Sequence, residues 1–117
     1  MKFSSSLKLN HIFRRLYATS GYANSVLVLY ARRNRSDANR VGITVSKKLG
    51  GAVVRNRVRR RLREVYRLHE AQFTPGWDIV VVARTRTVTA DFDRLTHAYL
   101  SLAKKAGILI PEQECVP

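Results

Sequence analysis

The chain has 117 residues, enough for one domain with a modest core, and 45% of them are hydrophobic, which excludes a disordered basic tail. Twenty-two Lys and Arg residues against eight Asp and Glu residues give a formal net charge of +14. Such a charge repels itself in the folded state and no fold requires it, so it predicts a polyanionic partner, with nucleic acid first and an acidic membrane surface second.

The N-terminal half of the chain predicts a helix and two strands. Apolar residues at helical spacing predict a short helix over residues 9–17, and they are Leu9, Phe13, Leu16 and Tyr17. The apolar, β-branched run SVLVLYA at 25–31 predicts a buried strand. The segment RVGITVSK at 40–47 alternates apolar with small or polar residues, which predicts a second strand. The short connection between these runs predicts an antiparallel hairpin.

The segment VVRNRVRRRLREVYRLHE at 53–70 holds seven arginines between Arg55 and Arg67, with Glu64 as the only acid among them. At 100° per residue, its apolar side chains fall within a sector of about 120°. That stripe consists of Val54, Val58, Leu62, Val65, Tyr66, His69 and Phe73. The opposite side consists of Asn56, Arg59, Arg60, Arg63 and Arg67, with Arg57 and Arg61 along one edge of the stripe. The pattern predicts an amphipathic helix held in place by its buried stripe.

The remaining elements follow after a turn signal at residues 74–76. WDIVVVAR at 77–84 predicts another buried strand, and helical spacing from Asp91 to Ala106 predicts a last helix. We expect one domain over residues 1–110 and a flexible tail over 111–117. No run approaches the ~20 apolar residues of a spanning helix, and the N-terminus lacks the long apolar run of a signal peptide, so we expect a cytoplasmic protein without a membrane partner.

The arginine face predicts an interaction with nucleic acid. A merely solvated helix face mixes charges of both signs, whereas here they stand at seven to one. A membrane-surface helix is less favoured, because the apolar side is used by the core. Arginine presents a planar fork that matches phosphate. DNA remains open on charge alone, although the chain shows neither a helix-turn-helix partner nor a dimer signal.

The residues predict no active site within the protein itself. The eight acids show no pattern of paired carboxylates, and His11, His69 and His97 lie on separate elements without metal-ligand spacing. Cys115 is the only cysteine, so no intrachain disulfide or cysteine zinc site is possible. We therefore expect no catalytic residue and no metal site, which disfavours a stand-alone metal-dependent nuclease. A ribosomal or other structural RNA-binding protein remains open.

The segment SKKLGGAVVRNRVRRRLREVYR, Ser46–Arg67, resembles the signature of the bacterial ribonuclease P protein subunit, whose centre is an Arg-Asn-Arg triplet, here Arg55, Asn56 and Arg57. The order of elements is similar over nearly the whole chain. The resemblance implies an α+β fold, a two-layer α/β sandwich of about four mixed strands and three helices in the order α-β-β-β-α-β-α, like the second domain of ribosomal protein S5. It also implies a left-handed βαβ crossover, against the general right-handed preference.

The resemblance also implies a function. Such a protein binds a catalytic RNA and the 5′ leader of precursor tRNA, and it assists the endonucleolytic removal of that leader. It would be the accessory subunit of a ribonucleoprotein endoribonuclease, a hydrolase whose chemistry the RNA carries. Mg²⁺ would be required through the RNA, and the protein itself would bind no cofactor. One protein copy would act in each complex.

Two candidate sites carry over by position from the resemblance. The catalytic RNA would contact Lys47, Lys48, Arg55, Asn56, Arg57, Arg59, Arg60, Arg63 and Arg67. The leader would lie in a cleft between the first helix and the sheet, against Phe13, Tyr17 and Tyr30. Stacking of bases on aromatic rings contributes ~1–3 kcal/mol per base and tolerates many sequences. For Phe13 and Tyr30, packing in the core is the alternative interpretation.

Overall fold

The computed structural model describes residues 4–6 and 21–110, and all elements below lie in those ranges. The strands are β1 (Ser4–Ser6), β2 (Tyr22–Ala23), β3 (Leu27–Arg33), β4 (Asn39–Thr44) and β5 (Trp77–Ala83). The helices are α2 (Ala52–His69), α3 (Thr85–Thr89) and α4 (Phe92–Lys105), with 3-10 turns at Lys47–Leu49 and Glu70–Gln72. The sheet order is β1-β4-β5-β3-β2. It is mixed, because β5 pairs parallel with β4 and antiparallel with β3.

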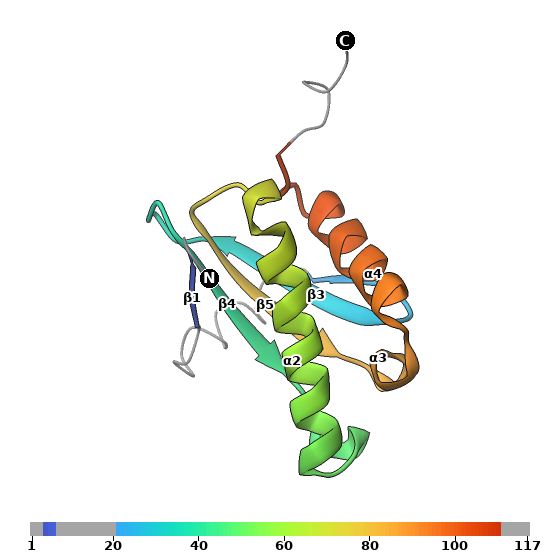
Figure 1. The fold of residues 1–117 in the computed structure, drawn as a ribbon. Helices are drawn as coiled ribbons and strands as arrows, with labels where there is room; N and C mark the ends of the chain where they lie inside the picture. The colour runs from blue at the N-terminus through green and yellow to red at the C-terminus, as the bar shows by residue number, and fades with distance from the viewer. Residues whose placement is uncertain (1–3, 7–20, 111–117) are drawn as a thin grey trace.

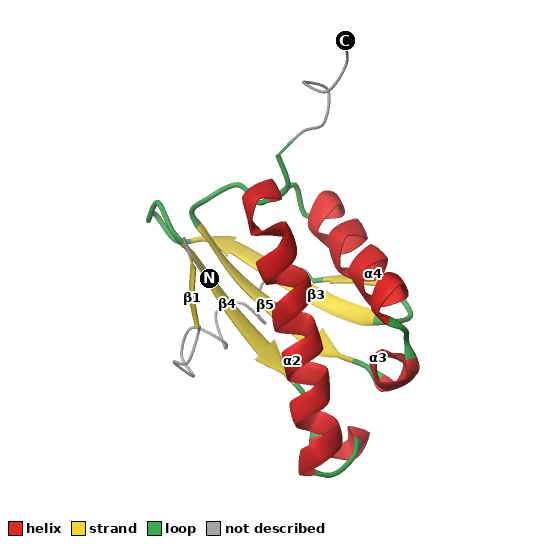
Figure 2. Ribbon diagram, viewed as in Figure 1, coloured by secondary structure: helices red, strands yellow, loops and turns green. Residues whose placement is uncertain are grey.

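The elements form two layers (Figure 1; Figure 2). Helices α2 and α4 lie side by side over one face of the sheet, and α3 packs near the end of β5. This confirms the predicted sandwich of helices on a mixed sheet. The structure adds the short edge strand β1 and the one-turn helix α3. The expected first helix, with Phe13 and Tyr17, lies outside the described residues.

The connection from β4 through α2 to β5 is left-handed. In Figure 1, β4 and β5 run downward, α2 lies in front of them, and β5 is to the right of β4. A right-handed crossover with this strand direction would place β5 to the left. The structure therefore confirms the handedness that the resemblance implied, and it places the arginine helix on the same side of the sheet as α4.

The predicted hairpin between the second and third strand regions is wrong. Strands β3 and β4 do not pair, because β5 lies between them and bonds to both. Bridging one intervening strand requires about 10 Å, which the five residues between Arg33 and Asn39 span easily at ~3.3 Å each. The central place suits β5 because its sequence is a continuous apolar run. Ile79, Val80 and Val81 are fully buried there.

Candidate nucleic-acid interface

Helix α2 is anchored by the apolar stripe that its sequence predicts. Val58, Leu62, Val65 and Tyr66 are all buried, with exposed fractions of at most 2%. Val54 and His69, at the two ends of the stripe, are half-buried. Phe73 follows the helix and packs its ring 4.8 Å from the ring centre of Tyr66. The stripe contacts the sheet and α4, so the opposite side of the helix is directed to solvent.

The loop before α2 carries two exposed lysines to the start of the helix. Ser46 caps the 3-10 turn, since its side-chain oxygen accepts from the Lys48 amide at 3.2 Å. Gly50 has φ 147°, and a Cβ there would lie 2.9 Å from the Cβ of Val54, so glycine is required for this turn. Lys47 and Lys48 are exposed. The first turn of α2 contains no acid, which keeps the positive end of the helix dipole uncompensated.

Three arginines of α2 have partners within the protein. The Arg61 guanidinium donates to the Ala90 carbonyl at 2.6 Å, which ties α2 to the segment before α4. Arg67 donates two hydrogen bonds to the Glu64 carboxylate, at 2.8 and 2.6 Å. This pairing lowers the pKa of Glu64 and raises the pKa of Arg67. Arg59 donates to the Asn56 side-chain oxygen at 3.2 Å. Arg67 is thus the only candidate RNA-binding residue on the described part of α2 that an acid holds.

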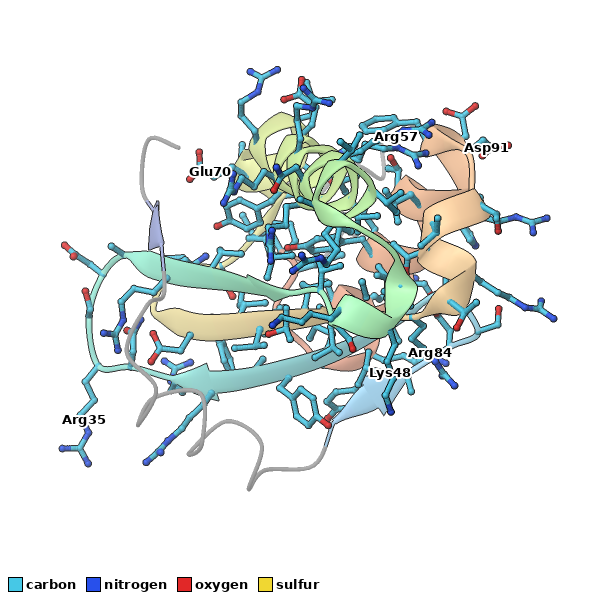
Figure 3. All side chains as sticks on the ribbon, turned by 90° about the horizontal axis from the view of Figure 1, so that it is seen from below. Arg35, Lys48, Arg57, Glu70, Arg84 and Asp91 are labelled. Carbon is cyan, nitrogen blue, oxygen red and sulfur yellow. The ribbon has the colours of Figure 1, made fainter. Side chains whose placement is uncertain are left out.

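The other exposed arginines of α2 remain available. Arg57, Arg60 and Arg63 form no hydrogen bond or ion pair with any described residue. Figure 3 looks along α2 and shows Arg57 extending on the outer side of the helix layer, away from the sheet. Arg55 is half-buried, and its Nε atom is buried without a partner among the described residues. Arg57, Arg60 and Arg63 can donate hydrogen bonds to phosphate oxygens without first breaking a protein ion pair.

Two acids in the described part of the chain, Asp78 and Asp91, have structural roles. Asp78 is 5% exposed and accepts from the Arg40 guanidinium at 2.8 and 2.7 Å. Asp91 caps α4 by accepting from the Arg94 amide at 2.7 Å. Within the same part of the chain, no three His, Cys, Asp or Glu residues gather as a metal site would require. None of the described helices is both long and apolar enough to cross a bilayer.

The sheet face away from α2 and α4 carries Tyr30, the one described residue of the predicted leader cleft. Register places Tyr30 beside Val80, which in turn lies beside Gly42. Tyr30 is half-buried, and a Cβ at Gly21 would come within 2.6 Å of its ring, so glycine lets the chain pass there. Phe13 and Tyr17 lie outside the described residues, so the helical wall of the cleft stays a prediction.

The charged row at the end of this face was missed from the sequence. It consists of Arg32, Asp78 and Arg40, which are neighbours across three strands. The signal was present, because Arg32 follows Tyr30 by two positions and a strand directs such residues to one face.

Comparisons with known proteins agree on one family. A family model described as Ribonuclease P matches residues 1–107. The ribonuclease P protein component of Clostridioides difficile is 42% identical over 109 residues, covering 92% of this chain and 96% of that protein. The component from Alkaliphilus oremlandii is 41% identical over 110 residues, covering 93% and 96%.

Solved structures give the same result. The RNase P protein of Staphylococcus aureus superposes with a TM-score of 0.81 at 33% identity, covering 90% of this chain and 97% of that one. The protein from Thermotoga maritima gives a TM-score of 0.78 at 30% identity, covering 86% and 96%. The similarity therefore spans almost the whole chain, including the arginine helix and both sheet faces.

Proposed function

The chain belongs to the ribonuclease P protein family, and we propose that it binds the catalytic RNA through α2 and the 5′ leader of precursor tRNA through the opposite sheet face. It is the protein component of a ribonuclease and works with the ribonuclease P RNA on precursor tRNA. In this proposal the protein is an accessory subunit, present as one copy in each cytoplasmic complex. Its task is to hold RNA, and the RNA carries out the cleavage.

The free arginine face of α2 is the observation that supports this function most strongly. The buried stripe fixes the helix, so Arg57, Arg60 and Arg63 project from a rigid support. When it binds phosphate, an arginine on a rigid helix loses less conformational entropy than one on a mobile segment, because its backbone is already ordered. Lys47 and Lys48 extend the same positive surface at the N-terminal end of the helix. The surface suits the backbone of a folded RNA, where phosphate contacts dominate affinity.

The proposal assigns the leader to the face that carries Tyr30. Single-stranded RNA is held by stacking on aromatic rings within a basic groove, and this hold tolerates many base sequences. Phe13 and Tyr17 would complete the cleft. We expect Phe13→Ala to weaken binding of precursor tRNA more than binding of mature tRNA, which a fluorescence competition assay measures. Equal losses for both ligands would contradict a leader cleft.

The proposal assigns no chemical step to a protein side chain. Asp78, Glu64 and Asp91 are already engaged by Arg40, Arg67 and the Arg94 amide, respectively. Mg²⁺ would supply charge neutralisation and activation of water within the RNA, as two-metal sites do in phosphoryl chemistry. The protein contributes positive charge that lowers the repulsion between the catalytic RNA and its substrate.

Reconstitution tests this function against the alternative of a structural RNA-binding protein. The protein is added to the catalytic RNA at a low Mg²⁺ concentration, and the removal of the leader from precursor tRNA is followed by gel electrophoresis. We expect clear stimulation over the RNA alone, because the protein replaces part of the cation requirement. Binding without stimulation would favour the alternative, and cleavage by the protein without RNA would revive a protein nuclease.

A further inference from the structure

The connection between β3 and β4 presents arginines at the end of the molecule remote from the start of α2. Arg32 ends the leader face of β3, two residues after Tyr30 and thus about 7 Å along the strand. Arg35 is at the tip of the connection, and Figure 3 shows it projecting from the end of the sheet, on the side away from α2. Both side chains are exposed.

Hydrogen bonds of Asn34 hold the backbone of the connection and so fix the position from which Arg35 extends. The Asn34 side chain donates to the Ala38 carbonyl and to Asp78, both at 3.0 Å, and accepts from the Ser36 amide at 2.8 Å. The Asn34 amide donates to the Gly76 carbonyl at 2.9 Å. Arg35 has φ 62°, so its backbone takes the left-handed conformation that turns the chain back.

No acid of the described residues forms an ion pair with Arg32 or Arg35. Asp78 is the acid nearest to Arg32 by register, but Arg40 occupies both of its carboxylate oxygens. Outside the described ranges, the sequence contains only two acids, Glu112 and Glu114, both in the last seven residues. Asp37, two residues after Arg35, is exposed and forms no ion pair with any described residue. The Arg32 and Arg35 guanidinium groups are therefore available to a phosphate.

The neighbouring Arg33 differs although it is also exposed. Strand alternation directs it to the other face of β3, where its guanidinium carbon lies 5.4 Å from the centre of the Trp77 ring. Stacking on that ring is a cation–π contact within the protein. Arg32 and Arg33 thus form a matched pair with equal charge, adjacent positions and opposite faces.

The strand direction sets the sequence in which a bound strand of RNA would meet the residues of this face. Strand β4 ends at Thr44 and leads directly into Lys47 and Lys48, where the proposed catalytic RNA surface begins. Register puts Thr44 beside Val82, and Val82 beside Val28. This row therefore lies at the end of the sheet from which the chain leads into Lys47 and Lys48. Tyr30 follows in the middle and Arg32 at the far end, and Figure 3 places Lys48 and Arg35 at opposite ends of the strands.

We propose that Arg32 and Arg35 form a phosphate-binding extension of the leader face, which holds the leader nucleotides farthest from the cleavage site. The inference rests on the proposed function, because a leader that leaves the catalytic RNA near Lys48 passes Tyr30 before it reaches Arg32. The extension reads phosphate and not base identity, so it favours longer leaders of any sequence. The ligand is single-stranded RNA.

The test compares precursor tRNAs with leaders of about three and about ten nucleotides, lengths chosen around the footprint of a single-strand groove. Each is bound to the holoenzyme assembled from this chain and the catalytic RNA, and affinities are measured before cleavage. The variant is Arg32→Gln with Arg35→Asn, since asparagine tolerates the left-handed conformation. Arg33→Gln is the matched control, and circular dichroism verifies folding of both variants.

We expect the wild-type holoenzyme to bind the longer leader more tightly and the double variant to lose most of that difference. For the longer leader, the log–log salt slope should become shallower by about 1.4, at ~0.7 for each of two lost phosphate contacts. Binding of the short leader and of mature tRNA should not change, and Arg33→Gln should behave as wild type.

Several results would overturn the extension. One is a double variant that keeps the preference for longer leaders, and another is an Arg33→Gln control that loses as much of this preference as the double variant. Equal weakening of binding to all ligands would also contradict it. So would a wild-type holoenzyme that cleaves precursor tRNA but shows no leader-length preference. A wild-type protein that fails to stimulate leader removal would instead refute the proposed function. The two failures are therefore distinguishable.

Discussion

Glu64 is the only acid on α2, and at the scale of single residues it limits the RNA-binding face by holding Arg67. We predict that Glu64→Gln strengthens association with the catalytic RNA, because Arg67 is released for a phosphate. The log–log salt slope should steepen by up to ~0.9. Filter binding over a salt series measures this change. Asp93→Asn on α4 is the control, since it removes an exposed acid outside α2 and should have a smaller effect.

The same ion pair has a pH dependence whose sign follows from the lowered pKa of Glu64. A carboxylate with a lowered folded-state pKa stabilises the fold above its unfolded pKa of about 4.3 and loses this contribution as the pH falls. Acidification below about pH 4.3, through the lowered folded-state pKa of Glu64, should therefore release Arg67, while the helix keeps its buried stripe.

Tyr99 is a second residue whose environment makes a testable difference. It is fully buried, its hydroxyl has no hydrogen-bond partner among the described residues, and burial raises its pKa. Tyr99→Phe should leave the free energy of unfolding unchanged or raise it by ~1 kcal/mol, because it removes an unsatisfied polar group. Tyr66→Phe should lower it by about 0.5–1.5 kcal/mol, since the Tyr66 hydroxyl accepts from Asn39 at 3.1 Å. Urea denaturation measures both, and a large loss for Tyr99→Phe would contradict this reading.

At the scale of elements, a free arginine face requires α2 to be docked on the sheet and α4 by its buried stripe. Leu62 is fully buried beneath the helix, whereas Leu68 is 53% exposed on the same helix. Leu62→Ala should lower the free energy of unfolding by about 2–5 kcal/mol, and Leu68→Ala should change it far less. Thermal unfolding measures both. If the two variants were equally stable, the buried stripe would not be what holds the helix.

Elements with strong local patterns were predictable from the sequence, and pairings between strands were not. Helix α2 was predicted at 53–70 and spans Ala52–His69, and β5 was predicted at 77–84 and spans Trp77–Ala83. The periodicity of buried residues is local, so it sets these elements. Which strand pairs with β3 depends on contacts between residues far apart in the sequence, which local periodicity does not contain. The place of β5 between β3 and β4 was therefore not predicted. Strand β2 has two residues, too few for any pattern.

At the scale of the whole molecule, the sequence predicted which surface is positive and the structure showed which cations are free. The outer position of Arg60 and Arg63 follows from helical spacing alone, whereas spacing placed Arg57 at the edge of the buried stripe. The engagement of Arg61 by a backbone carbonyl and of Arg67 by Glu64 depends on rotamers and tertiary neighbours, which spacing does not encode. Phe13 and Tyr17 came from resemblance, and their part in a cleft stays a prediction.

The most direct test of the central claim measures affinity for the catalytic RNA against salt concentration, for the wild type and for Arg60→Ala with Arg63→Ala. We predict weaker binding and a log–log slope shallower by about 1.4–1.8, at ~0.7–0.9 per lost phosphate contact, with an unchanged unfolding transition. A paired control, Arg86→Ala with Arg94→Ala, removes equal charge from exposed positions on α3 and α4. It should change the affinity and the salt slope less. An unchanged slope, or a variant that unfolds, would contradict an arginine face held free for RNA.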